Sequence, residues 1–150
     1  MLIRNVLVAF DASENSDRAL DFALDLGEKY NAAVTVLNVS EPPSIGAVPQ
    51  EPTAYSGSNM TVFAKDLRKL HEEILSKAVA RAKAVKPNLA ISWKLREGDP
   101  ALEIVDAAKE GGFDVIVVGH KGTGRVKEFF LGSISEKVAH LAPCLVVIVR

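Results

Sequence analysis

The sequence predicts an α/β protein with a five-stranded parallel sheet in the strand order 3-2-1-4-5 and helices on both faces. Short apolar runs rich in Val, Ile and Leu alternate along the chain with longer segments whose apolar residues recur at helical spacing. Such alternation is typical of parallel sheets joined by right-handed crossovers. The length of 150 residues, 48% of them hydrophobic and 25% charged, fits a single domain over residues 1–150.

The first two strands and the helix between them come first in the chain. Residues 2–10 hold the apolar run VLVAF and predict a strand, and residues 33–39 (AVTVLNV) predict a second because β-branched side chains favour strands. Between them, apolar residues at helical spacing predict a helix over residues 16–30. Ser13 and Asn15 are the candidate N-terminal caps of this helix.

Residues 40–60 predict a long flexible surface loop, because they contain four of the seven prolines and no apolar period. Residues 61–85 then predict a long helix. Its expected inward stripe contains Leu67, Leu70, Ile74, Ala78 and Val79, whereas Glu72, Glu73, Lys77 and Arg81 are expected to face water. His71 lies beside two glutamates and is expected to be solvated.

The second half of the chain supplies three strands and two helices. The predicted strands are residues 89–96, 114–118 and Leu145–Val149. Asp99 as N-cap and Pro100 at the first helical position predict the start of a helix, and a glycine pair at residues 111–112 predicts its end. A last helix is predicted from about residue 133 to residue 140.

Ligands of such sheets bind beyond the carboxyl ends of the strands, where the strand order reverses. Asp11 follows the first predicted strand, Val39 ends the second, and Gly119 follows the fourth. Because strands one and four are neighbours in the predicted order, Asp11 and Gly119 are expected to line one crevice.

A glycine-rich, basic segment, GHKGTGRVKEFFLGSISE, starts at Gly119. Glycine lets a ligand approach the main chain closely, and the free amides at the start of a helix attract anions. The candidate anion-binding residues are Gly119, Lys121, Gly122, Arg125, Gly132 and Ser133, and no carboxylate lies between Gly119 and Lys127. A turn glycine or a simple serine cap explains any one of them alone. Their combination predicts a phosphate site.

Two further side chains near this segment have alternative roles. Asp11 is a carboxylate facing the expected phosphates, so it is expected to bind ribose hydroxyls or a water linked to Mg²⁺. The alternative is a cap for the following helix. His120 either touches the phosphate or lies at the loop surface.

Composition and missing motifs exclude several functions. A formal net charge of −1 argues against a general nucleic-acid binder. The sequence has no P-loop, no dinucleotide fingerprint, and no metal-ligand spacing among its three histidines and single cysteine. It shows no signal-peptide pattern and no apolar run of the roughly 18 residues that span a bilayer, so a cytoplasmic protein with no membrane partner is expected.

The spacing Gly119-x2-Gly122-x9-Gly132-Ser133 matches the G-x2-G-x9-G-[S/T] signature of the universal stress protein family, in its ATP-binding subclass. The stretches NVLVAFDASENSDRALDFALDLG, GDPALEIVDAAKEGGFDVIVVG and LGSISEKVAHLAPCLVVIV also resemble that family, so the resemblance runs along the whole chain. The chain departs from the family pattern in the pair His120-Lys121, in Ala12 after the aspartate, and in the additional Gly124.

The resemblance implies a Rossmann-like fold of the adenine nucleotide alpha hydrolase-like type. It implies ATP or another adenine nucleotide as ligand, with Mg²⁺ held through the phosphates rather than directly by side chains. The implied contacts are Gly119, Gly122, Gly132 and Ser133 with the phosphates, Asp11 with the ribose, and the backbone of Ala9 and Val39 with adenine. Ile134 is a further expected contact with the nucleotide. A homodimer through Leu145–Val149 is also implied, and pairing would cover an apolar edge strand.

The favoured function is a dimeric, ATP-binding regulator of the stress response, read by an unknown protein partner, with slow or no hydrolysis. No general base stands out beside the phosphate segment. Two alternatives stay open: a nucleotide-hydrolysing or adenylyl-transferring enzyme of the related α/β superfamily, and an interaction protein whose glycine segment binds nothing. The loops H-x-G-H and S-G-G-x-D-S of the related enzymes do not occur here.

Overall fold

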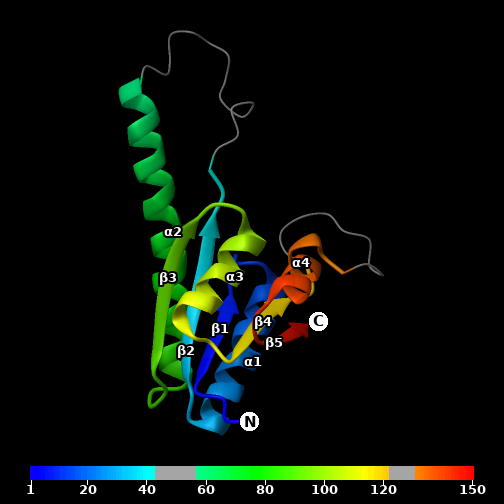
Figure 1. The fold of residues 1–150 in the computed structure, drawn as a ribbon. Coiled ribbons are helices and arrows are strands. Elements are labelled where there is room, and N and C mark those ends of the chain that lie inside the picture. Colours follow the sequence, from blue (N-terminus) through cyan, green and yellow to red (C-terminus); the bar gives the residue numbers. More distant parts are fainter. Residues whose placement is uncertain (43–56, 122–130) are drawn as a thin grey trace.

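The computed structural model describes residues 1–42, 57–121 and 131–150, and for residues 57–60 only the backbone is described. Strands and helices alternate along the chain (Figure 1). The strands are β1 (Asn5–Ala9), β2 (Ala33–Ser40), β3 (Ile91–Glu97), β4 (Val115–Gly119) and β5 (Leu145–Val149). The helices are α1 (Glu14–Tyr30), α2 (Gly57–Val85), α3 (Pro100–Gly111) and α4 (Ser133–Leu141).

The five strands form one parallel sheet in the order β3-β2-β1-β4-β5, which confirms the predicted fold. β1 lies between β2 and β4, with Val6 opposite Val115 and Val8 opposite Val117 in the β4 pairing. Helices α1 and α2 cover one face of the sheet, and α3 and α4 cover the other (Figure 1). All five strands therefore end at the same edge, which we call the carboxyl edge.

Two apolar layers explain why the central strands are nearly uninterrupted apolar runs. Val6 and Val8 pack on the side of α1 and α2, whereas Leu7 packs on the side of α3 and α4. All three side chains are fully buried. Burying one such side chain stabilises the fold by about 1.5–3 kcal/mol, so these strands give the carboxyl edge a rigid base.

The helix ends follow the capping chemistry of the sequence. Ser13 is the residue that caps α1, since its Oγ accepts a hydrogen bond from the Ser16 N–H at 3.2 Å. Asp99 caps α3 by accepting from the Leu102 N–H at 2.9 Å, and Pro100 occupies the first turn. Gly112 ends α3 in the left-handed conformation with φ 60°, which confirms the predicted stop.

The loop predicted over residues 40–60 is too long at both ends. Ser40 is the last residue of β2, and α2 begins at Gly57. Residues 43–56 lie outside the described part of the chain.

The predicted inward stripe of α2 is partly wrong. Leu70 is 53% exposed, whereas Leu75, Ala78, Val79 and Ala82 are buried at the i, i+3, i+4, i+7 spacing of one helix face. Leu70 lies five residues before Leu75, and residues five apart do not share a face of an α-helix. The side chain of Leu70 therefore points away from the sheet.

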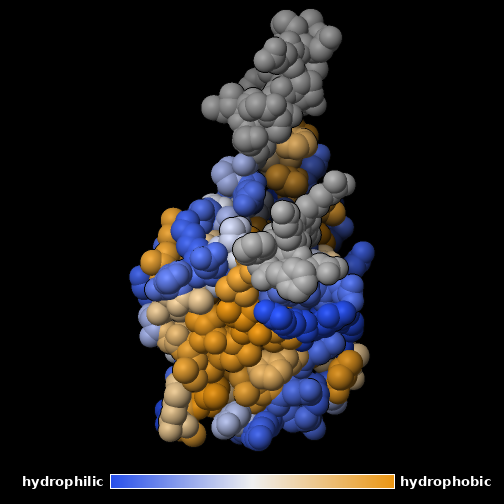
Figure 2. Space-filling view, turned by 90° about the vertical axis from the view of Figure 1, so that its right-hand side faces the viewer, coloured by the Kyte–Doolittle hydropathy of each residue, from blue (hydrophilic) through white to orange (hydrophobic). Residues whose placement is uncertain are grey.

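The β5 edge of the sheet is apolar. Its five residues read LVVIV; Leu145 is 49% exposed and the following four are half-buried. Figure 2 views the molecule from this side and shows hydrophobic residues gathered over one broad area. We call the outer side of β5 the apolar edge.

Candidate functional site

The carboxyl edge brings together most of the residues that the sequence predicted for the ligand. Ala9 is the last residue of β1, and Val39 is the residue before the last of β2. Both face the side of α3 and α4 and are half-buried. Extending the pairing of Val8 with Val117 by two residues places Phe10 level with Gly119. The predicted closeness of the β1 and β4 ends is therefore confirmed.

Asp11 stabilises the turn between β1 and α1 through two hydrogen bonds. Its Oδ1 accepts a hydrogen bond from the Ser13 N–H at 2.9 Å, and its own N–H donates to Ser16 Oγ at 3.3 Å. Ala12 adopts φ 65°, a left-handed conformation that is strained for a residue with a Cβ. Because Ser13 provides the helix cap, the alternative role of Asp11 as the cap is wrong. Its carboxylate is half-buried, and within the described part of the chain Oδ2 makes no hydrogen bond.

Gly119 and Gly132 allow two helices to approach the end of β4 closely. A Cβ on Gly119 would lie 2.9 Å from the backbone of Asn15 in α1. A Cβ on Gly132 would lie 2.8 Å from the backbone oxygen of His120. Two of the four glycines in the predicted anion segment thus have a packing role that the sequence analysis did not foresee.

The backbone of His120 forms hydrogen bonds that connect the end of β4 to β5 and to the start of α4. Its N–H donates to the Val149 carbonyl at 2.8 Å, and its carbonyl accepts from the Gly132 N–H at 2.8 Å and from Ser135 Oγ at 3.1 Å. Ser135 is 3% exposed and was missed by sequence reasoning. These bonds hold the start of α4 directly beside the end of β4.

Positive charge surrounds this junction. Burial lowers the pKa of the His120 imidazole, and the nearby charges of Lys121, Arg150 and Arg18 lower it further. The imidazole is therefore neutral near pH 7. Its Nδ1 is buried and has no hydrogen-bond partner within the described ranges.

The first residues of α4 present their backbone amides at the positive end of the helix. Gly132 occupies the N-cap position and has no side chain to satisfy those amides. Ser133 and Ile134, both predicted ligand contacts, are the first two residues of the helix and are exposed. The predicted residues Gly122 and Arg125 lie outside the described residues.

Asn38 and His71 form a buried polar contact that the sequence analysis missed. The Nδ1 atom of His71 lies 2.6 Å from Oδ1 of Asn38, whose Nδ2 donates to the Phe10 carbonyl at 2.7 Å. The expectation that His71 is solvated is wrong: four residues before Leu75, it lies on the helix face that meets the sheet and is half-buried. The signal was Asn38 itself, a polar residue within the apolar run AVTVLNV.

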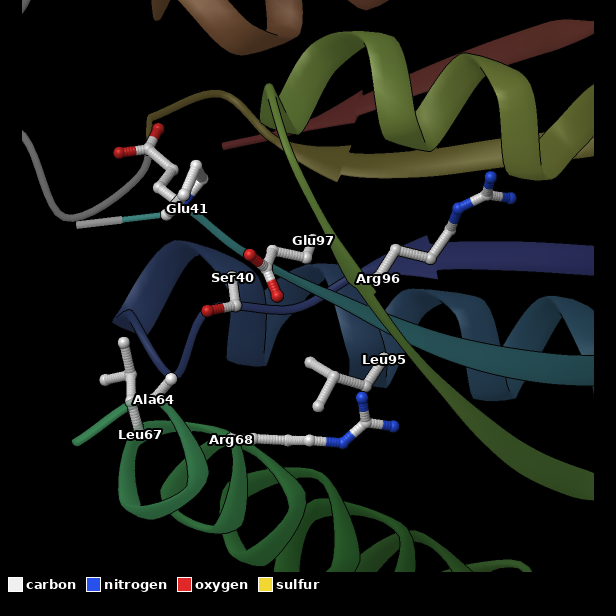
Figure 3. A pocket seen from close by; sticks show the side chains of 9 residues that line it. Ser40, Glu41, Ala64, Leu67, Arg68, Leu95, Arg96 and Glu97 are labelled. Atoms are coloured by element: carbon white, nitrogen blue, oxygen red, sulfur yellow. The ribbon is translucent and has the colours of Figure 1, made fainter. Parts of the chain in front are cut away.

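A small cavity of ≈ 70 Å³ opens at the carboxyl edge on the side of α2 (Figure 3). Figure 3 shows Ser40 and Glu97 at the ends of β2 and β3, and Arg68 on α2 below them. The full lining is Ser40, Glu41, Pro42, Ala64, Leu67, Arg68, Leu95, Arg96 and Glu97. Typical small-molecule sites measure about 300–1,000 Å³, so this cavity is too small for a typical small-molecule ligand.

Other chemistry receives no support from the described side chains. Burial, followed by the charge of Asp114, raises the pKa of the Cys144 thiol, so it stays protonated and acts as a packing residue. Within residues 1–42, 57–121 and 131–150, no group of three His, Cys, Asp or Glu side chains is arranged to hold a metal ion. Nor does any described helix combine the length and apolar character that crossing a bilayer requires.

The family model of the universal stress protein family matches residues 2–150 of this chain. The chain belongs to the universal stress protein family. Universal stress protein YxiE of Bacillus subtilis (strain 168) is 33% identical over 150 residues, covering 99% of this chain and 100% of that protein. A universal stress protein of Thermus aquaticus is 33% identical over 149 residues, covering 99% of this chain and 100% of that protein.

Solved universal stress proteins share the fold. UspA from Lactobacillus plantarum superposes with a TM-score of 0.82 at 24% identity, covering 100% of this chain and 99% of that one. A universal stress protein in complex with cAMP has a TM-score of 0.73 at 27% identity, with 100% and 99% coverage. The Archaeoglobus fulgidus protein in complex with dAMP has a TM-score of 0.63 at 25% identity, with 100% of both chains covered.

Proposed function

We propose that this universal stress protein binds an adenine nucleotide at the carboxyl edge, with ATP as the main ligand. The observation that carries the proposal is the β4–α4 junction, where exposed helix amides at Ser133 and Ile134 lie beside a strand end surrounded by cationic side chains. The structures of relatives with cAMP and dAMP support the choice of an adenine nucleotide.

In this proposal each part of the nucleotide has its own contacts. The phosphates lie along Gly119, Lys121, Gly122, Arg125, Gly132, Ser133 and Ile134. Asp11 binds the ribose or a water of Mg²⁺ through Oδ2, and the backbone of Ala9 and Val39 lies against adenine. Mg²⁺ enters with the phosphates. The sequence offers no candidate general base beside the phosphate segment, so we expect slow or no hydrolysis.

The proposed working form is a cytoplasmic homodimer that pairs through Leu145–Val149 and whose nucleotide state is read by a partner protein. The half-exposed apolar edge supports pairing, because an uncovered apolar edge strand invites association. Two copies pairing through the same strand would form a two-fold, self-complementary interface.

Calorimetric titration of ATP, ADP, AMP and adenosine with Mg²⁺ tests the ligand. Ser133→Pro is the informative variant, since proline is favoured at the first helical position and removes the N–H that would meet a phosphate. It also removes the serine hydroxyl, and Ser133→Ala removes that hydroxyl alone. Gly132 has φ −64° and ψ 146°, the conformation preferred before proline, so the helix start is preserved. Gly132→Val would instead push a Cβ to 2.8 Å from the His120 oxygen and distort the junction itself.

We expect Ser133→Pro to weaken ATP binding about tenfold or more, because a hydrogen bond to a charged group is lost. Ser133→Ala, which keeps the amide, should bind nearly as the wild type does, and adenosine should not distinguish the variants. A folded wild-type chain that takes up none of the four ligands would contradict the proposed function.

A further inference from the structure

The hydrogen bonds around Asn38 fix the orientation of its side chain. Asn38 is 4% exposed and points to the side of α1 and α2, as do Val34 and Val36 of the same strand. The Phe10 carbonyl is only an acceptor, so the atom 2.7 Å from it is the amide nitrogen of Asn38. The amide oxygen therefore faces His71 and accepts its Nδ1–H at 2.6 Å.

This chain of hydrogen bonds ends on the peptide that precedes the predicted ribose contact. The Phe10 carbonyl and the Asp11 N–H belong to one planar peptide unit. Asn38 holds the carbonyl side of that plane, and Ser16 Oγ accepts the Asp11 N–H at 3.3 Å on the other side. Rotation of this peptide would turn the Asp11 carboxylate away from the carboxyl edge.

His71 lies in the N-terminal half of α2, just before the helix becomes buried against the sheet. Residues 61–66 are exposed, and the first buried residue along the described side chains of α2 is Leu75. The contact of His71 with Asn38 thus connects this half of α2 to the end of β1, which lies on the other side of β2.

We propose that Asn38 and His71 are positioning residues of the nucleotide site. His71 holds the Asn38 amide in one orientation, Asn38 holds the Phe10–Asp11 peptide, and the peptide presents the Asp11 carboxylate to the ligand. The inference rests on the proposed function. Neither residue touches the ligand.

Nucleotide titrations of four variants test this role. Asn38→Leu keeps a side chain of similar size in the apolar layer but makes neither hydrogen bond, and His71→Ala removes only the outer one. His71→Asn is the conservative variant, because its amide nitrogen stands in the place of Nδ1. Glu73→Ala, an exposed change on the same helix, is the matched control.

We expect His71→Ala to weaken ATP binding about three- to tenfold, the effect of losing one ordinary hydrogen bond. Asn38→Leu, which loses both hydrogen bonds, should weaken it at least as much. His71→Asn should restore most of the affinity, and Glu73→Ala should leave it unchanged. In NMR spectra, the Nδ1–H resonance of His71 should shift when ATP is added. A purely structural role would not produce a ligand-dependent shift of that proton.

Hydrogen exchange of the Asp11 amide separates the two proposals. Exchange should be faster in Asn38→Leu than in the wild type, with or without nucleotide. Wild-type affinity in Asn38→Leu would overturn the positioning role while leaving the proposed function intact. A wild-type chain that binds no adenine nucleotide would overturn both the positioning role and the proposed function. Exchange of the Asp11 amide would then measure only whether the Asn38 hydrogen bond stabilises the turn between β1 and α1.

Discussion

Gly119 lies so close to Asn15 that a methyl group on its α-carbon would stand 2.9 Å from the Asn15 carbonyl carbon, carbonyl oxygen and Cβ. The end of β4 and the first turn of α1 are therefore in main-chain contact. Glycine at this position serves the packing of the sheet against α1, whatever ligand the carboxyl edge binds. The packing role of Gly119 predicts a change in stability on substitution, whereas its proposed role in ligand binding predicts a change in affinity.

Gly119→Ala should lower the free energy of unfolding by about 1–3 kcal/mol, because the added methyl group overpacks the contact with α1. Urea denaturation followed by circular dichroism measures the change. A second substitution, Asn15→Gly, should not restore stability, since two of the three close atoms belong to the backbone. If Gly119→Ala were as stable as the wild type, the close contact would not exist in solution.

Ala12→Gly should stabilise the chain by about 0.5–1 kcal/mol. Relief of the left-handed strain at φ 65° outweighs the greater freedom that glycine has in the unfolded chain. Ala12→Val, which has a β-branched side chain at the same φ, should destabilise it. Thermal unfolding of the three proteins gives the order Gly, Ala, Val, and a reversed order would contradict the strained turn.

Asp114 should make stability depend on pH in the acidic range. Hydrogen bonds from the Arg4 and Asn5 N–H groups, at 2.8 and 2.9 Å, lower the pKa of its carboxyl group below the ordinary 3.8. The carboxylate therefore stabilises the fold above pH 3.8, and this contribution is lost as the pH falls through the lowered folded-state pKa.

Comparison with Asp114→Asn between pH 7 and pH 3 isolates this contribution. The wild type should be more stable than the variant from pH 7 down to about pH 5, and the difference should shrink below that. A difference that stays constant down to pH 3 would show that the Asp114 charge contributes nothing. Asp106→Asn, for which no hydrogen bond is recorded among the described residues, is a suitable control.

Leu145→Lys should weaken self-association if two copies pair through β5. A charged side chain in the middle of an apolar contact should raise the dimer dissociation constant about tenfold or more. Size-exclusion chromatography with light scattering measures it. Leu102→Lys on α3 is the matched control, because Leu102 is 44% exposed and Leu145 is 49% exposed. A wild-type chain that is monomeric at every concentration would contradict pairing.

Patterns within single elements were enough to predict the fold. Hydrophobic periodicity and the caps at Asp99 and Gly112 indicated the elements, and alternation indicated a parallel sheet. The strand order was predicted as the order common among such sheets. Contacts between elements were not predictable in the same way. His71 has the sequence surroundings of an exposed helix residue, and only its position relative to Asn38 on another element makes it half-buried.

In the candidate site, too, positions along the chain were predictable from the sequence, whereas contacts between elements were not. Asp11, Gly119 and Ser133 were predicted from motif and strand position, and all three lie at the carboxyl edge. The packing of Asn15 on Gly119 and the bonds of Ser135 to His120 depend on how closely the helices approach β4. The spacing of residues along the chain does not determine the distance between these helices and β4.

The two outer strands of the sheet differ in chemistry. β5 is uncharged, whereas β3 reads ISWKLRE, with an exposed Lys94 and with Arg96 paired to Glu103 and Glu110 of α3. Addition of the β5 strand of one copy to the β3 edge of another would strip water from these charges. Growth of a continuous sheet from copy to copy is therefore disfavoured at the β3 end of every molecule. If two copies pair through β5 as proposed, we expect strand-to-strand assembly to stop at two chains instead of extending into a fibre.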